Sequence, residues 1–298
     1  MKNQRILGSA AVALAYCLWG FLTLYWNLLS EADPLYILAH RIFWSMIFMG
    51  IFIFIAKRTA EIKTVFRSKQ DLALCFACGI LITVNWGAYI IAVMNGHILD
   101  ASLGYFIEPI LVSVIGMLAF KERLSKWETI TLCFSVIGLL YMIVTTRTMP
   151  ALALIIAGSF AVYGAVKKRL GISAETSLFT ETLCMAPFAF AFILLAEQNG
   201  SGALGILQGA EFLLLPLCGI VTSVPLLLFN IGVKKIPYYI SGLLMYINPT
   251  IQFLMGLFFF GEPMNIHRLI AFIIIWVGIS FTVYEKIRLI RSEKRTTP

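Results

Sequence analysis

Long apolar runs alternate with short polar segments along the whole chain. Ten runs of about 18 to 24 residues contain few charged side chains. Each run could cross a hydrocarbon layer of about 30 Å as a helix that rises about 1.5 Å per residue. We therefore expect membrane spans at residues 6–29, 34–56, 72–93, 101–120, 127–146, 149–168, 175–197, 211–232, 238–260 and 267–285.

The chain also contains an internal repeat with an offset of 140 residues. Two prolines lie inside apolar runs, and each is followed at the same interval by a glycine and then a glutamate: Pro109, Gly116, Glu122 and Pro249, Gly256, Glu262. Because proline removes a backbone donor, we predict helix breaks at Pro109 and Pro249. Broken helices of two repeats line the substrate site of many membrane transporters, so the repeat predicts such a site.

Lysine and arginine are distributed unevenly between the predicted loops. If the N-terminus is cytoplasmic, 20 of these residues fall at the inner side, Arg147 and Arg268 lie outside, and Arg41 lies within the second span. Cytoplasmic loops normally carry this excess, so we expect both termini in the cytoplasm. Five spans in residues 1–147 and five in residues 148–298 then predict an all-α integral membrane protein, with ten transmembrane helices as two inverted five-helix repeats.

The composition agrees with this class. Apolar residues make up 60% of the chain and charged residues only 13%, whereas a soluble domain carries roughly 25% charged residues. The net charge of +8 follows from the inner loops and their attraction to anionic membrane lipids, so it does not indicate nucleic acid. The first run is longer than the apolar region of a signal peptide, and we interpret it as a retained span.

Several short motifs occur in a fixed order along the chain. They are His40-Arg41 with Trp44, Asn85-Trp86 with Tyr89, residues 102–109, residues 121–124, residues 224–226 with Phe229, and Gly242 with Tyr246 and Pro249. In order and spacing they resemble the RarD proteins of the EamA group, in the drug/metabolite transporter (DMT) superfamily, over nearly the whole chain. The resemblance implies a permease of the bacterial plasma (inner) membrane with ten helices in two inverted halves, which moves small metabolites or drugs. Glu108 departs from the family pattern, which usually has Asn there, as it has at Asn248.

Glu108 is the first candidate for substrate binding or proton coupling. A carboxylate near the bilayer centre costs about 2.5 to 3.5 kcal/mol on insertion scales, so it faces the protein interior. The 140-residue shift places Tyr105 and Glu108 opposite a polar stripe that contains Asn248 and Gln252, and two facing stripes would form a cavity wall. The alternative is a structural Glu108 that is hydrogen-bonded to a neighbouring helix.

Arg41 is the second candidate, because a buried guanidinium needs a partner. We expect Glu108 or Glu181 to provide it. Arg41 then binds an anionic substrate group or tunes a proton-carrying glutamate, or it forms a structural ion pair that locks two helices. His40 and Trp44 lie on the neighbouring face of the same span. A lone histidine is more often a packing residue than a proton switch.

Other candidates follow from shared helix faces. We expect the cavity to be lined by Asn85, Tyr89, Tyr105 and Tyr246, and by the stripe Tyr16, Trp19, Thr23 and Trp26. Aromatic rings near span ends have the alternative role of membrane anchors. Alanines at 153, 157, 161 and 165 predict close helix packing. Glu122 and Glu262, at span ends, are expected to terminate helices or pair with nearby basic residues.

No catalytic, cofactor or metal motif emerges from the sequence. It contains neither a nucleotide-binding glycine loop nor a zinc-protease motif, and the pair Cys75 and Cys78 lacks further ligands. We therefore expect a secondary active permease and not an enzyme, with alternating access driven by proton coupling or exchange, which a monomer could perform. The alternatives are a lipid flippase, a lipid-modifying membrane enzyme, or an uptake permease of the same fold.

Overall fold

The structure is a computed structural model that describes residues 2–29, 31–94, 98–146, 151–203, 212–259 and 266–296. These residues form helices and turns, and the described part contains no strand. The helices are α1 (Lys2–Asn27), α2 (Pro34–Ile55), α3 (Thr59–Arg67), α4 (Lys69–Met94), α5 (Ile98–Phe120), α6 (Lys126–Thr146), α7 (Ala151–Arg169), α8 (Ala174–Gln198), α9 (Leu214–Val233), α10 (Tyr238–Leu244), α11 (Ile247–Phe258) and α12 (Ile266–Thr296).

Six helices of the described chain, α1, α2, α4, α6, α8 and α9, are long and apolar enough to cross a membrane. Shorter apolar segments lie within α5 and α12. The outer surface is apolar as well, since Phe54, Leu118 and Phe188 are 76%, 77% and 68% exposed. A water-soluble protein rarely exposes so many large apolar side chains together. The chain is a multi-pass membrane protein.

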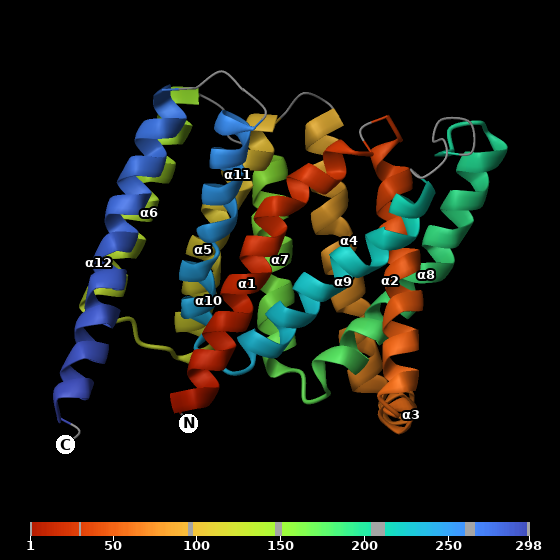
Figure 1. Ribbon diagram of the computed structural model, residues 1–298, viewed down its shortest axis with the longest axis horizontal. Helices are drawn as coiled ribbons and strands as arrows, with labels where there is room; N and C mark the ends of the chain where they lie inside the picture. The colour runs from red at the N-terminus through yellow and green to blue at the C-terminus, as the bar shows by residue number, and fades with distance from the viewer. Residues whose placement is uncertain are drawn as a thin grey trace.

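Segments far apart in sequence lie side by side in the bundle (Figure 1). At one side α6 packs along α12, and at the other α2 packs against α8 and α9. Between these pairs α1 contacts α9, α10 and α11, while α7 contacts both α4 and α5, and α5 also contacts α10. The two marked ends of the chain lie at the same end of the bundle as α3 (Figure 1).

Local capping explains where several helices begin. Asp33 precedes Pro34, and its Oδ1 accepts hydrogen bonds from the backbone N–H of Leu35 (2.8 Å) and Tyr36 (3.1 Å). Ser125 and Glu128 form a reciprocal capping box at the start of α6, with N–O distances of 2.7 and 3.2 Å. These caps satisfy donors that a helix start leaves free.

The short helix α3 is tied to the start of α8 through Glu61. Its carboxylate accepts hydrogen bonds from the Ser173 backbone N–H (2.8 Å), the Ser173 hydroxyl (2.7 Å) and the Thr176 hydroxyl (2.8 Å). Burial raises the pKa of Glu61, but these hydrogen bonds and Arg58 outweigh it, so the pKa lies below its ordinary value of 4.5. The ionised form therefore holds α3 in place.

Small residues allow the helices to approach closely. A Cβ on Gly232 of α9 would lie 2.6 Å from the Gly8 carbonyl oxygen of α1, so a larger side chain would push these helices apart. In α7, Ala153, Ala157 and Ala161 are fully buried. The close packing that their four-residue spacing predicts is confirmed.

The two repeat prolines act differently. The predicted helix break near Pro249 is present, because α10 ends at Leu244 and α11 begins at Ile247. The predicted break at Pro109 was wrong, because α5 continues through that residue. Pro109 leaves the carbonyl of Tyr105, one turn earlier, without its usual donor. The missing donor therefore weakens the helix locally without ending it.

Glu122 explains why the repeat motif has a glycine at Gly116. Its carboxylate accepts hydrogen bonds from the backbone N–H groups of Tyr238 (2.7 Å) and Tyr239 (3.0 Å), where α10 begins, and lies 3.6 Å from Lys168 Nζ. A Cβ at Gly116 would lie 2.7 Å from this carboxylate, so the glycine makes room for it. The prediction that Glu122 ends a helix or pairs with a basic residue is confirmed, and Glu262 lies outside the described residues.

We expect Glu122→Ala to lower the free energy of unfolding by about 1 to 3 kcal/mol, because it leaves the first N–H groups of α10 without an acceptor. Denaturant unfolding of the purified protein measures this change. Arg123→Ala is the matched control, because Arg123 is an exposed neighbour in the same turn. Equal stability of the two variants would contradict the capping role of Glu122.

Candidate functional site

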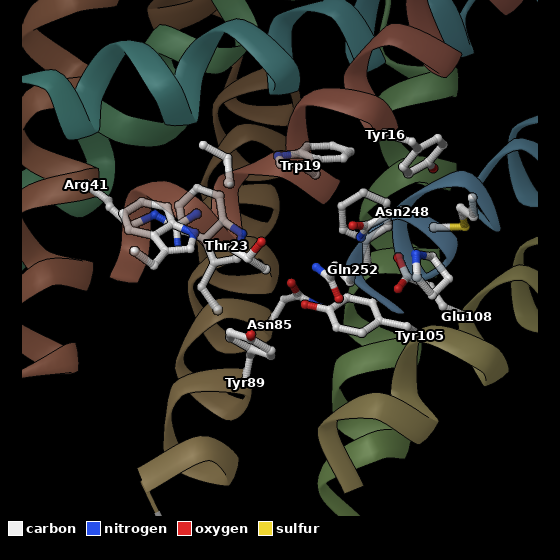
Figure 2. A pocket seen from close by; sticks show the side chains of 16 residues that line it. Tyr16, Trp19, Thr23, Arg41, Asn85, Tyr89, Tyr105, Glu108, Asn248 and Gln252 are labelled. Atoms are coloured by element: carbon white, nitrogen blue, oxygen red, sulfur yellow. The ribbon is translucent and has the colours of Figure 1, made fainter. Parts of the chain in front are cut away.

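A cavity of about 90 Å³ lies in the centre of the bundle (Figure 2). This volume holds several water molecules. Its walls come from α1, α2, α4 and α5 in the first half of the chain, and from α7 and the junction of α10 and α11 in the second half. The polar and ionisable side chains in the wall are Tyr16, Thr23, Arg41, Asn85, Tyr89, Tyr105, Glu108, Asn248 and Gln252.

Arg41 stands at one end of the cavity (Figure 2). Its guanidinium carbon lies 4.5 Å from the ring centroid of Trp26 and 4.1 Å from that of Trp86. Its Nε donates to the Thr222 hydroxyl at 3.2 Å. The predicted carboxylate partner was wrong for the described part of the chain. The negative faces of two indole rings stabilise the cation instead, which leaves the outer guanidinium nitrogens without a carboxylate.

Glu108 lies across the cavity from Arg41, with Asn248, Gln252 and Tyr105 between them in Figure 2. Its side chain is only 5% exposed. No hydrogen bond or ion pair joins it to another described residue. A buried carboxylate without a protein partner is costly, so this group is suited to a bound molecule or a proton.

One further polar atom at the cavity wall has no partner among the residues that the structure describes. It is the Asn248 Oδ1 atom, in a buried residue. Asn85 differs, because its Nδ2 donates to the Ile156 carbonyl oxygen at 2.7 Å. An unsatisfied buried polar atom costs about 1 to 3 kcal/mol. Asn248 therefore offers a hydrogen bond to a bound molecule, whereas Asn85 ties α4 to α7.

Seven of the predicted binding residues lie in the cavity wall: Arg41, Asn85, Tyr89, Tyr105, Glu108, Asn248 and Gln252. The predicted aromatic stripe of the first span lines it as well, through Tyr16, Trp19, Thr23 and Trp26. The structure brings these side chains together from five helices. Their function in binding stays a prediction.

Four predicted residues lie elsewhere. His40 and Trp44 contact each other, with Trp44 Nε1 donating to His40 Nδ1 at 3.1 Å. Tyr246 is buried in a separate apolar cluster that includes Met142. Glu181 forms an ion pair with Lys167 and not with Arg41. These side chains are not among those that line the cavity.

Sequence reasoning missed three important side chains. Phe160 lines the cavity, and the repeat offset places it one residue from the counterpart of Trp19, which was the available signal. Trp86 was noted only as part of a motif, although it stacks on Arg41. Lys167 was counted as an inner-loop charge, but the structure buries it completely. Lys167 is the first of three consecutive basic residues at the end of α7, and the sequence does not show that its side chain is the buried one.

Fold and site together define a multi-pass helical membrane protein with a polar cavity between the two halves of its chain. The model of the EamA-like transporter family matches residues 6–144 and again residues 148–284. The chain therefore belongs to the EamA-like transporter family. The motifs predict a resemblance to RarD-type members, and RarD relatives that match nearly the whole chain confirm it.

Relatives match over nearly the whole chain. "Uncharacterized transporter YojE" of Bacillus subtilis (strain 168) is 35% identical, over 96% of this chain and 97% of that protein. "Protein RarD" of Escherichia coli (strain K12) is 33% identical over 96% of both. A solved crystal structure covers 97% of this chain and 99% of its own with a TM-score of 0.70, at 17% identity, which shows a shared fold.

We expect Asn248→Leu to leave the free energy of unfolding within about 1 kcal/mol of the parent, because it removes a buried oxygen that has no described partner. Asn230→Leu is the matched comparison, since Asn230 is buried and its Nδ2 donates to the Tyr163 hydroxyl at 3.2 Å. That variant should lose about 1 to 3 kcal/mol. Denaturant unfolding compares them, and a larger loss for Asn248→Leu would argue against an open polar position at the cavity.

Proposed function

We propose that this protein is a secondary active transporter that moves small metabolites or drugs across the bacterial plasma membrane by alternating access. The observation that carries this proposal is the central cavity, whose unpartnered polar atoms come from both halves of the chain. Membership of the EamA-like transporter family supports it. The same membership favours a transporter over a lipid-modifying enzyme.

Ten crossings account for the helices better than the six long apolar ones alone. The other four are α5 with its apolar part 107–120, α7, the pair α10 and α11, and α12 with its apolar part 269–285. The break between α10 and α11 divides one crossing, and α7 ends in three basic residues, which lowers its mean hydropathy. Termini at the same end of the bundle (Figure 1) support an even number.

The pattern of helix contacts supports two inverted repeats. The repeat relates α1 to α7, α2 to α8, α4 to α9, α5 to α10 and α11, and α6 to α12. The most extensive contacts then have counterparts: α1 with α9 matches α7 with α4, α2 with α9 matches α8 with α4, and α5 with α7 matches α11 with α1. The pairs α2 with α8, α5 with α10 and α6 with α12 are their own counterparts. A two-fold axis in the membrane plane explains this pattern.

The cavity has chemically different ends. Arg41 offers a permanent positive charge that is held in place by two indole rings, so it can bind an anionic or strongly accepting group of the substrate. Glu108 can accept a hydrogen bond from a donor group or take up a proton. Tyr89, Tyr105 and Phe160 supply aromatic surface between them. The proposed substrate is a small amphipathic molecule with a donor at one end and an acceptor at the other.

The ten-span arrangement predicts a topology with cytoplasmic termini, in keeping with the excess of basic residues in the inner loops. Reporter fusions after residues 60, 97, 125, 205 and 290 should report inside, outside, inside, outside and inside. Enzymatic reporters that are active on only one side of the membrane measure this. Two consecutive fusions on the same side would contradict the ten-span arrangement.

The transport activity can be tested without knowing the substrate. A panel of amphenicols, amino acids and other small metabolites is screened for compounds that raise the thermal stability of the purified protein, because a ligand of the native state stabilises it. A stabilising compound should then show saturable counterflow in proteoliposomes. Chemical conversion of the compound would indicate an enzyme, and movement of labelled lipid instead of the compound would indicate a flippase.

Glu108→Gln should lower the gradient-driven accumulation of such a compound by about tenfold or more, because it removes one charge-assisted contact or the titrating group. Asp71→Asn is the control, since Asp71 lies in the first turn of α4 and away from the cavity. Accumulation and counterflow are measured with equal amounts of folded protein. Unchanged accumulation at several pH values would exclude both proposed roles of Glu108.

A further inference from the structure

A second ionisable site lies within the bundle, outside the cavity wall. Lys167 of α7 and Glu181 of α8 form an ion pair, and their side chains are 0% and 1% exposed. Lys167 Nζ also donates to the Ser177 hydroxyl, which in turn donates to Glu181 Oε1 at 2.6 Å. Nothing in the cavity chemistry described above requires a buried charge pair at this place.

The network continues from the ion pair into α9. Asn230 Nδ2 donates to the Tyr163 hydroxyl at 3.2 Å, and this hydroxyl donates to Glu181 Oε2 at 3.4 Å. Both carboxylate oxygens of Glu181 are therefore satisfied, and three helices are joined through one side chain. Because buried networks of this kind depend on every member, a change in the charge of Glu181 affects all three helices.

An aromatic cluster connects this network to the cavity. The ring of Tyr163 lies 5.8 Å from that of Phe160 and stacks at 6.5 Å on Phe229, while Phe160 and Phe229 are 5.1 Å apart. Trp19 lies 5.7 Å from Phe160 and 6.0 Å from Phe229. Trp19 and Phe160 belong to the cavity wall. The cluster therefore lies between the cavity and the ion pair, and α7 carries both Phe160 and Lys167.

The ion pair lies near the end of the bundle that holds the two chain termini. Lys167 is two residues from the end of α7, and Glu181 is seven residues from the start of α8, which corresponds to about 10 Å of helix. The ionisable groups that face the pair are Tyr163 of α7, Cys75 and Cys78 of α4, Cys184 of α8 and Lys234 at the end of α9. Glu61 and Glu175 also interact with Lys234 at this end of the bundle, but Glu181 is the fully buried carboxylate and the one paired with Lys167.

We propose that Glu181, paired with Lys167, is a proton-binding site that controls whether the cavity opens toward the cytoplasm. The proposal rests on the proposed transport function for its biological meaning. A proton that binds to the Glu181 carboxylate gives a neutral acid, and the charge pair with Lys167 is lost. The Lys167 ammonium then stays buried without a counter-ion, which is unfavourable in the membrane interior.

Movement of Lys167 to water removes that penalty, and it moves the end of α7. Phe160 and Tyr163 move with the same helix, so the aromatic cluster separates and the cavity opens to the side of the termini. Loss of the proton restores the ion pair and the closed bundle.

Hydrogen–deuterium exchange of the full-length purified protein tests this proposal without a substrate. Between about pH 7 and about pH 3.5, a range that covers the ordinary titration of a glutamate side chain, the amides of residues 160–181 should lose about tenfold in protection, after correction for the chemical exchange rate. In the double variant Lys167→Met with Glu181→Met, which replaces the charges with apolar side chains of similar length, these amides should stay protected at every pH. Glu175→Gln, on the same helix and paired with the exposed Arg58, should behave like the parent.

Glu181→Gln provides a second variant, since glutamine imitates the protonated acid. Its amides 160–181 should exchange at the fast, low-pH rate at every pH, while α6 and α12 keep their protection and so report an intact fold. Protection in the parent that does not change with pH would overturn the proposal, and so would an unchanged pH response in the double variant. If no compound shows counterflow, the proposed transport function is wrong. The hydrogen–deuterium exchange result still tests whether Glu181 controls the opening of the cavity.

Discussion

The structure depends on the requirement that polar groups inside an apolar bundle find partners within the protein. Lipid offers no hydrogen bonds, and each unsatisfied group costs several kcal/mol there. Glu122 meets this requirement at the first N–H groups of α10, Glu181 meets it through Lys167, and Arg41 through two indole rings and Thr222. The contacts of Glu122 and Arg41 join the two halves of the chain, so satisfying polar groups also fixes how the halves dock.

The central cavity is one of the places where this requirement is left unmet among the described residues. Glu108 and the Asn248 Oδ1 atom have no hydrogen-bond or ion-pair partner there, although each belongs to a buried residue. The ion pair of Lys167 and Glu181, beyond the aromatic cluster, is fully satisfied. The bundle thus holds two polar sites. The cavity lacks protein partners for some of its polar groups and can bind a molecule there, whereas the ion pair of Lys167 and Glu181 is complete without one. This contrast is what alternating access requires, because one site must exchange its contents while another holds a conformation.

Helical periodicity and the 140-residue repeat were sufficient to predict most of the cavity wall. Glu108, Asn248 and Gln252 were predicted because their spacing places them on facing stripes, whereas Phe160 of α7 and Trp86 of α4 were missed. The partner of Arg41 was not predictable, because stacking between Trp26 and Trp86 depends on how α2 docks against α1 and α4. Lys167 was misread for a related reason: local sequence does not show which residue of a basic run turns inward to meet a carboxylate one helix later.

Thiol labelling of a single engineered cysteine tests the central claim, that the cavity is a site which solutes reach from either side of the membrane. In a variant that lacks the six native cysteines, Thr23→Cys places a thiol in the cavity wall, and Phe188→Cys places one on the lipid-facing surface of α8. Membrane-impermeant thiosulfonate is applied separately to each face of oriented vesicles. The account predicts that the thiol at position 23 reacts from both faces and the thiol at position 188 from neither. A thiol at position 23 that is as inert as the one at position 188 would contradict it.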